Sequence, residues 1–238
     1  ESGSWEIPPP ARSSETTHMM AAGCTHEVAN AVLDPLEDAG LNVSVLDARS
    51  WALARAAAAR CPDEMHGISA LLDIGDAGAL LTMLHGQTPV YRRFMSDGGL
   101  ESLCGRLMQK LALDSETAWY ATRTLLDSAS TGSGDSGMDK EVEGFFEEHV
   151  GMLLTELTAA AEYVGHRYPP GLQRVLLSGP IASAAGLMER LSGNFAVPIE
   201  RGVVSGIAEV PGALVKVADD PSLFAAAGLA LASLGSAA

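Results

Sequence analysis

The sequence has 238 residues, of which 47% are hydrophobic and 19% charged, and its formal net charge is −15. This length and apolar fraction predict a globular protein with one large domain or two smaller ones. The negative charge argues against nucleic acid as a partner, because the few basic residues are scattered and form no basic face. No apolar run approaches the roughly 18 residues of a spanning helix, so we expect a soluble chain.

The first 47 residues predict a small unit of strands and one helix. A short strand at residues 5–7 ends at three prolines, and a second strand follows at residues 18–24. Thr25 is a candidate N-cap for a helix over residues 27–39, which Gly40 ends. Alternating apolar and polar residues then predict a strand at 41–46.

A helix follows at residues 51–61, within a connecting segment that spans residues 48–66. It consists almost wholly of Ala, Leu and Arg, and Pro62 ends it. Such small side chains predict close packing against a neighbouring helix or sheet.

Residues 67–95 predict three antiparallel strands. The first strand is almost continuously apolar, which is typical of a strand buried on both faces, and its last polar residue is Asp73, close to Gly75. A carboxylate at a strand end, followed by glycines whose N–H groups can turn toward an anion, suits a phosphate or metal-phosphate contact. The alternative interpretation is a tight hairpin that happens to contain an aspartate.

Helices and strands alternate through the rest of the chain, which predicts an α/β protein with a mixed sheet. Asp114 is a candidate cap for the second of these helices. The expected segments are helices at 100–113 and 115–126, a flexible loop at 127–138, a long helix at 139–166, a strand at 172–178, a helix at 182–191, a strand at 197–200, an irregular segment at 203–215 and a helix at 222–234.

Neither the histidines nor the cysteines suggest a metal site or a covalent nucleophile. The six histidines have no metal-binding spacing, so surface or satisfied core positions are expected. The three cysteines are an odd number without paired spacing, which predicts reduced core thiols in a cytosolic compartment.

Several stretches stand in an order that resembles the second half of an actin-like ATPase fold. Within that superfamily the chain is most similar to PilM, the actin-like protein of type IV pilus assembly. Residues 40–55 are similar to the PilM run that leaves an inserted subdomain and enters the long helix before the second lobe. The other stretches that carry the resemblance are Asp73-Ile74-Gly75, Asp97-Gly98-Gly99, Leu176-Leu177-Ser178-Gly179 and the C-terminal run of residues 224–231.

The resemblance implies an actin-like (ribonuclease H-like) α/β lobe with a mixed sheet over residues 67–238. Residues 1–47 would then be the remainder of a small α+β inserted subdomain. The first phosphate motif of this fold lies in an N-terminal lobe, and no second Asp-x-Gly strand precedes the one at Asp73. We therefore expect that lobe to be missing or degenerate, so that this chain supplies one side of a nucleotide cleft.

The resemblance also implies a nucleotide site for ATP and Mg²⁺. Its residues would be Asp73, Gly75, Asp76 and Gly78 in the second phosphate motif, with Asp73 as the Mg²⁺ ligand, and Gly179 and Pro180 in the adenosine motif.

Two residues of this site depart from the family pattern. Asp76 stands where small hydroxyl residues are usual, and a second carboxylate repels a triphosphate unless Mg²⁺ lies between them. Pro180 follows Gly179 and has no N–H to donate. We therefore expect weak or lost nucleotide binding and assign no catalytic residue.

The function that the resemblance implies is a scaffold, cytoplasmic and peripheral to the inner membrane, without a membrane span of its own. It would bind the cytoplasmic tail of a PilN-like membrane protein through residues 5–46 and join it to other pilus assembly proteins. One alternative is a working actin-like ATPase or kinase, with Asp73 organising Mg²⁺. Another is the related platform protein of type II secretion, which differs chiefly in being fused to a membrane helix.

Overall fold

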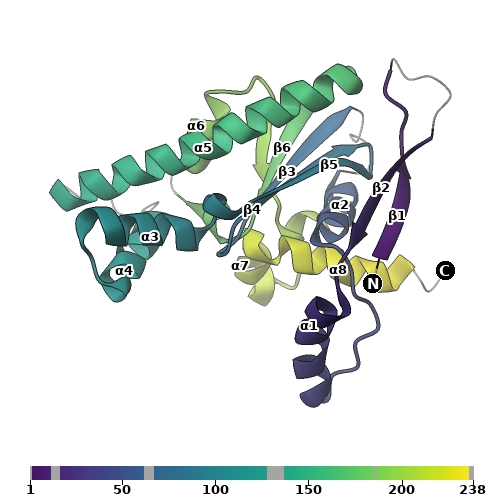
Figure 1. Ribbon diagram of the computed structural model, residues 1–238, viewed down its shortest axis with the longest axis horizontal. Coiled ribbons are helices and arrows are strands. Elements are labelled where there is room, and N and C mark those ends of the chain that lie inside the picture. Colours follow the sequence, from purple (N-terminus) through teal and green to yellow (C-terminus); the bar gives the residue numbers. More distant parts are fainter. Residues whose placement is uncertain (1, 12–16, 62–66, 128–136, 185, 236–238) are drawn as a thin grey trace.

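A five-stranded mixed sheet forms the centre of the molecule (Figure 1). The computed structural model describes residues 2–11, 17–61, 67–127, 137–184 and 186–235. The sheet order is β5–β4–β3–β6–β7. β3, β4 and β5 form an antiparallel meander, and β6 and β7 run parallel to β3. The strands are β3 (Ile68–Ile74), β4 (Ala79–His85), β5 (Thr88–Met95), β6 (Leu172–Ser178) and β7 (Ile199–Arg201).

Helices cover both faces of this sheet. The long helix α5 crosses one face together with α6, and α2 and α8 pack on the other (Figure 1). Beside α5, α3 and α4 form a smaller apolar cluster. The helices are α2 (Arg49–Arg60), α3 (Leu100–Leu111), α4 (Ser115–Asp127), α5 (Gly137–Arg167), α6 (Leu187–Ser192), α7 (Val215–Ala218) and α8 (Phe224–Gly235).

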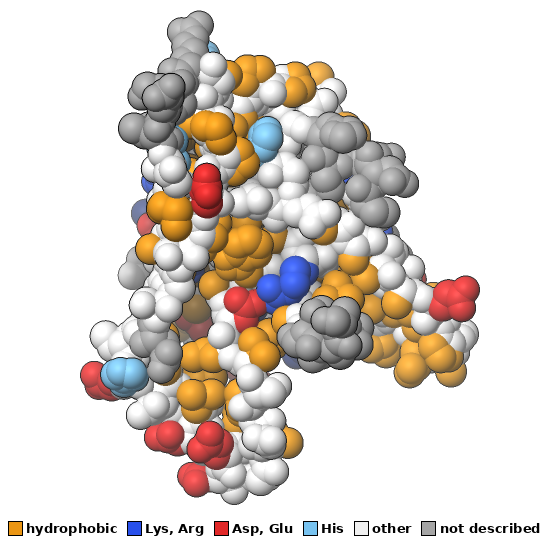
Figure 2. All heavy atoms as spheres, turned by 90° about the vertical axis from the view of Figure 1, so that its right-hand side faces the viewer, with side chains coloured by type: hydrophobic (Ala, Val, Ile, Leu, Met, Phe, Trp, Pro, Cys, Tyr) orange, Lys and Arg blue, Asp and Glu red, His pale blue; other side chains and the backbone are white. Residues whose placement is uncertain are grey.

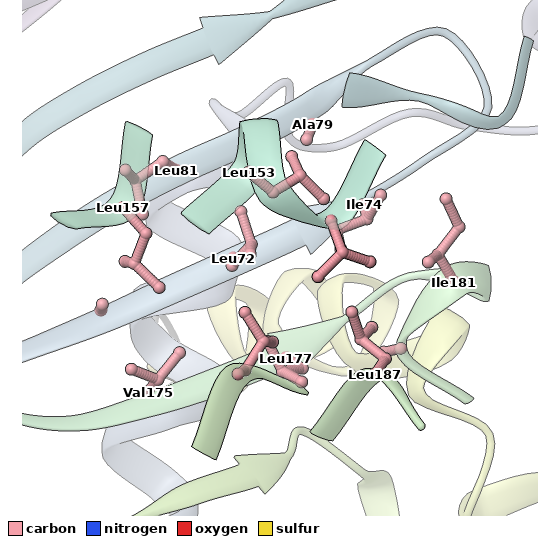
Figure 3. Packing of buried hydrophobic residues seen from close by; sticks show 14 of the residues in the cluster. Leu72, Ile74, Ala79, Leu81, Leu153, Leu157, Val175, Leu177, Ile181 and Leu187 are labelled. Atoms are coloured by element: carbon pink, nitrogen blue, oxygen red, sulfur yellow. The ribbon is translucent and has the colours of Figure 1, made fainter. Parts of the chain in front are cut away.

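The central strand β3 is buried on both faces, as its continuous apolar sequence predicts. Its even-numbered residues belong to the larger core, where Leu153 and Leu157 of α5 lie over β3 and β4 (Figure 3). Leu71 points to the opposite core, formed with α2 and α8. Since side chains alternate along a strand, Asp73 lies on the same face as Leu71, toward α2.

The N-terminal residues form a separate two-stranded hairpin of β1 (Ser2–Ile7) and β2 (His18–Gly23), followed by α1 (His26–Asp38). Thr25 caps α1 as predicted, because its hydroxyl accepts a hydrogen bond from the Val28 N–H at 3.3 Å. Trp5 joins the hairpin to the central sheet. Its Nε1 donates to the carbonyl of Pro89 on β5 at 3.0 Å, and its ring packs edge-on against Trp51 of α2 at 5.2 Å.

The strand predicted at residues 41–46 is absent, and this segment has no regular structure. The alternating pattern needs a neighbouring strand to satisfy the backbone. In the described part of the chain, the nearby sheet contains only β1 and β2, paired with each other. As a result, Leu41, Val45 and Leu46 are exposed.

The single helix predicted at residues 182–191 is interrupted. Residues Pro180–Ser183 form a short 3-10 turn, and α6 begins only at Leu187. Gly186 precedes α6 with a φ of +72°, a left-handed conformation that cannot continue a right-handed helix. Most of the loop predicted at 127–138 lies outside the described residues. The core position predicted for the cysteines holds only for Cys104, since Cys24 and Cys61 are half-buried.

Candidate functional site

Asp73 lies at the carboxyl end of β3 and is almost completely buried, with 3% of its surface exposed. On the neighbouring parallel strand, Ser178 is its direct register partner at the end of β6. Side chains two residues apart in a strand lie on the same face of the sheet. Leu71 and Leu176 belong to the core on the α2 side, so Asp73 and Ser178 also face α2. The parallel pairing of two buried strands therefore brings together a carboxylate and a hydroxyl that are 105 positions apart.

Three hydrogen bonds converge on the Asp73 carboxylate. The Ser178 hydroxyl donates to Oδ1 at 2.8 Å. Arg49, the first residue of α2, donates from Nη2 to Oδ1 at 3.2 Å and from Nε to Oδ2. Each carboxylate oxygen thus accepts from the planar fork of the guanidinium, a bidentate arrangement that is among the strong charge-assisted contacts in proteins.

The contact with Asp73 favours the charged form of Arg49. Its hydrogen bond to Asp73, together with their electrostatic attraction, raises the pKa of the guanidinium, although partial burial opposes the rise. About half of the Arg49 side chain, 51%, stays exposed to solvent. The cation therefore covers the buried carboxylate from the solvent side.

The turn from Gly75 to Gly78 is built against the start of α3. The Gly75 N–H donates to the Gly78 carbonyl at 3.0 Å, and the Gly75 carbonyl accepts from the Leu100 N–H at 3.1 Å. A side chain at Gly99 would place a Cβ 2.2 Å from the Asp76 carbonyl oxygen, so only glycine allows this approach. Asp76 itself is exposed on the turn.

Gly179 meets the same end of the sheet from β6. Its φ is +86°, and a Cβ there would lie 2.3 Å from the carbonyl oxygen of Ile74. Its N–H donates to the Pro221 carbonyl at 3.0 Å, so this donor is already used within the chain. The two sequence motifs therefore meet where β3 and β6 end, and Pro180 begins the next turn.

The residues present do not fit a magnesium ion held by Asp73. Magnesium requires near-octahedral oxygen ligands at about 2.0–2.1 Å. Here both Asp73 oxygens already accept hydrogen bonds from Arg49. Within the described residues no group of three or more His, Cys, Asp or Glu could hold a metal ion.

Two residues of this site, Arg49 and Ser178, were not predicted as site residues. Arg49 stands 24 positions before Asp73, and no local pattern links them. One signal does exist in the sequence. A basic residue at the first position of a helix opposes the helix dipole, so it indicates a carboxylate from elsewhere in the fold.

Behind the turn, His149 of α5 is fully buried and satisfied, as predicted for a core histidine. Its Nε2 donates to the Gly98 carbonyl at 3.1 Å, and its Nδ1 accepts from Arg106 at 2.7 Å, which defines a neutral ring. Burial and the charge of Arg106 lower the pKa of His149 to about 4, although the bond to Gly98 opposes this shift.

Comparison with solved structures shows that the chain has an actin-like fold. It superposes on the PilM-PilN type IV pilus biogenesis complex with a TM-score of 0.75 and 21% identity, covering 97% of this chain. The ethanolamine utilization protein EutJ from Carboxydothermus hydrogenoformans matches with a TM-score of 0.59, 18% identity and 88% of this chain covered. MreB5 of Spiroplasma citri bound to AMPPNP matches with a TM-score of 0.58, 12% identity and 88% of this chain covered.

The chain spans only part of each of these relatives: 66% of the PilM chain, 62% of EutJ and 65% of MreB5. No curated protein matches it by sequence. In the part of the chain that the structure describes, no helix is long and apolar enough to cross a membrane.

A sequence model of one family matches nearly the whole chain. The family is the type IV pilus assembly protein PilM, and the match covers residues 6–234. It agrees with the mixed sheet, with the ordered motifs on β3 and β6, and with the actin-like fold of the structural relatives. The chain therefore belongs to the PilM family of type IV pilus assembly proteins.

Proposed function

We propose that this chain is an actin-like scaffold of type IV pilus assembly that binds the cytoplasmic tail of a PilN-like membrane protein. The complex in which its relative was solved, a PilM-PilN complex, supports this partner. The contacts would lie within residues 5–46, in the inserted subdomain of residues 1–47. Localisation at the inner membrane would follow from binding to that partner.

The observation that carries this proposal is an exposed apolar stripe on α1. Val28, Val32 and Leu36 recur every four residues, so they share one face of the helix, and they are 58%, 53% and 37% exposed. Figure 2 shows hydrophobic side chains beside several acidic ones on the lower part of the molecule, where α1 lies in Figure 1. Contiguous exposed apolar surface of this kind marks binding sites for other proteins.

The segment after α1 also carries exposed apolar side chains. Leu41, Val45 and Leu46 are also exposed, although their apolar side chains would favour burial. An apolar face of a tail peptide that covers α1 and this segment would remove both from water.

A charge placed on this stripe tests the proposal. The substitution Val32→Asp adds a carboxylate to the apolar face, so we expect at least a tenfold loss of affinity for the tail peptide, measured by calorimetry. The matched control is Asn30→Asp, which adds the same charge at an exposed polar position of the same helix. Equal affinity of the two variants would contradict this placement of the tail.

We further propose that nucleotide binding is weak or lost in this chain. Two contacts support this proposal: Arg49 is bonded to the Asp73 carboxylate, and the Gly179 N–H is bonded to a backbone carbonyl. The carboxylate and the N–H would otherwise be available to the phosphates or the adenosine of a nucleotide. A working ATPase or kinase is the second candidate, favoured by the bound nucleotide analogue of the MreB5 relative. ATP binding that Asp73→Ala abolishes would favour this second candidate.

A further inference from the structure

The buried carboxylate of Asp73 requires a compensating charge. Moving an ionised carboxylate out of water is costly unless a cation and hydrogen-bond donors replace the water. In this chain Arg49 supplies the cation, and Ser178 supplies a further donor at 2.8 Å. The carboxylate is therefore satisfied by protein groups alone.

The position of Arg49 is explained by Asp73 and not by its own helix. Arg49 opens α2, where its positive charge is unfavourable beside the positive end of the helix dipole. The helix has no side-chain cap and no acidic residue in its first turn. Asp73, which reaches this end of α2 from β3, places a negative charge directly beside Arg49.

The guanidinium also excludes a metal from the same oxygens. Its Nε and Nη2 face both oxygens of the carboxylate, which is the geometry that a planar fork offers and a point charge does not. A divalent ion at this carboxylate and Arg49 in its present position are therefore mutually exclusive, both by contact and by charge.

We propose that the Arg49 guanidinium is the resident cation of the Asp73 site and takes the place of a divalent metal. The strand-end motif thereby becomes a metal-independent clamp, which holds the start of α2 to the ends of β3 and β6. This inference concerns the sheet and α2 alone, so it stands or falls separately from binding of a membrane-protein tail at α1.

The test compares Mn²⁺ binding to the unmutated chain and to Arg49→Gln, a shorter side chain that keeps an N–H donor but removes the charge. Mn²⁺ broadens backbone amide signals in NMR over a distance that also includes the exposed Asp76, so the broadening of Ile74 and Gly75 that Asp73→Asn removes is the part that reports on Asp73. We expect no Asp73-dependent broadening there in the unmutated chain and clear broadening in Arg49→Gln, lost again when Asp73→Asn is added.

The matched control is Arg93→Gln, which breaks a surface ion pair with Glu156 and should leave Ile74 and Gly75 unchanged. Broadening in the unmutated chain that Asp73→Asn removes would overturn the proposal, and this experiment needs no folded Arg49 variant. Failure of a folded Arg49→Gln protein to gain the Asp73-dependent broadening would also overturn it.

Discussion

At the scale of single residues, buried polar side chains lie behind the turn from Gly75 to Gly78. Their hydrogen bonds fit only one protonation state of each side chain. His149 is the clearest case, because it donates to a backbone carbonyl through Nε2 and accepts from Arg106 through Nδ1. Protonation of Nδ1 would set two cations against each other inside the core. The neutral ring is therefore part of the native structure.

This arrangement predicts a loss of stability in acid. The folded-state pKa of His149, about 4, lies below the ordinary value of 6.5. Between these two pKa values the unfolded chain binds more protons than the folded chain. The contribution of His149 to the free energy of unfolding is therefore complete above about pH 6.5 and is lost as the pH falls toward 4. At most it amounts to about 3 kcal/mol.

Urea unfolding as a function of pH measures this effect. The variant His149→Gln keeps an N–H donor but does not titrate, so its free energy of unfolding should depend less steeply on pH between 6.5 and 4. Parallel curves for the variant and the unmutated chain would show that the histidine is not held neutral in the folded state.

At the scale of elements, α2 and α8 approach each other unusually closely. A side chain at Gly228 would place a Cβ 1.8 Å from the carbonyl oxygen of Ala52, and the Gly228 carbonyl accepts from Arg55 at 2.9 Å. The small side chains of α2 allow this contact, as its alanine-rich sequence predicts.

The substitution Gly228→Ala therefore has a defined outcome. Because the new methyl group meets backbone, the helices must move apart, and we expect the free energy of unfolding to fall by about 2 kcal/mol or more. Gly144→Ala is the matched control, since nothing lies within 4 Å of its Cβ position in α5. That change should stabilise by about 0.5–1 kcal/mol, and equal effects in thermal unfolding would contradict the packing described here.

Sequence patterns predicted most elements correctly where the signal was local. The cap at Thr25, the cap at Asp114 and the buried strand β3 all depend on neighbouring residues or on periodicity. The pattern at 41–46 was misleading because a strand exists only beside a partner strand.

The candidate site could be predicted only in part for the same reason. Asp73 and Gly179 are recognisable as motif residues, and the structure brings their strand ends together. The contact between Arg49 and Asp73 depends on how α2 packs under the sheet, which no local pattern encodes. That tertiary contact changes the expected chemistry of the carboxylate.

At the scale of the whole molecule, the β1–β2 hairpin contacts the five-stranded sheet and its helices at several points. Trp5 contacts both β5 and α2, and the Tyr168 hydroxyl donates to the Pro8 carbonyl at 2.9 Å. The Ala11 N–H also donates to the Arg167 carbonyl at 3.0 Å. The exposed stripe of α1 follows directly on this anchored hairpin, which suits a surface that carries a partner.

We propose that partner binding, and not nucleotide chemistry, is the function of this chain. The most direct test of this proposal is a calorimetric titration of the PilN-like tail peptide into the unmutated chain, with and without Mg²⁺ and ATP. We expect saturable binding with the same affinity in both conditions. Absence of binding, or binding that appears only with Mg²⁺ and ATP, would contradict it.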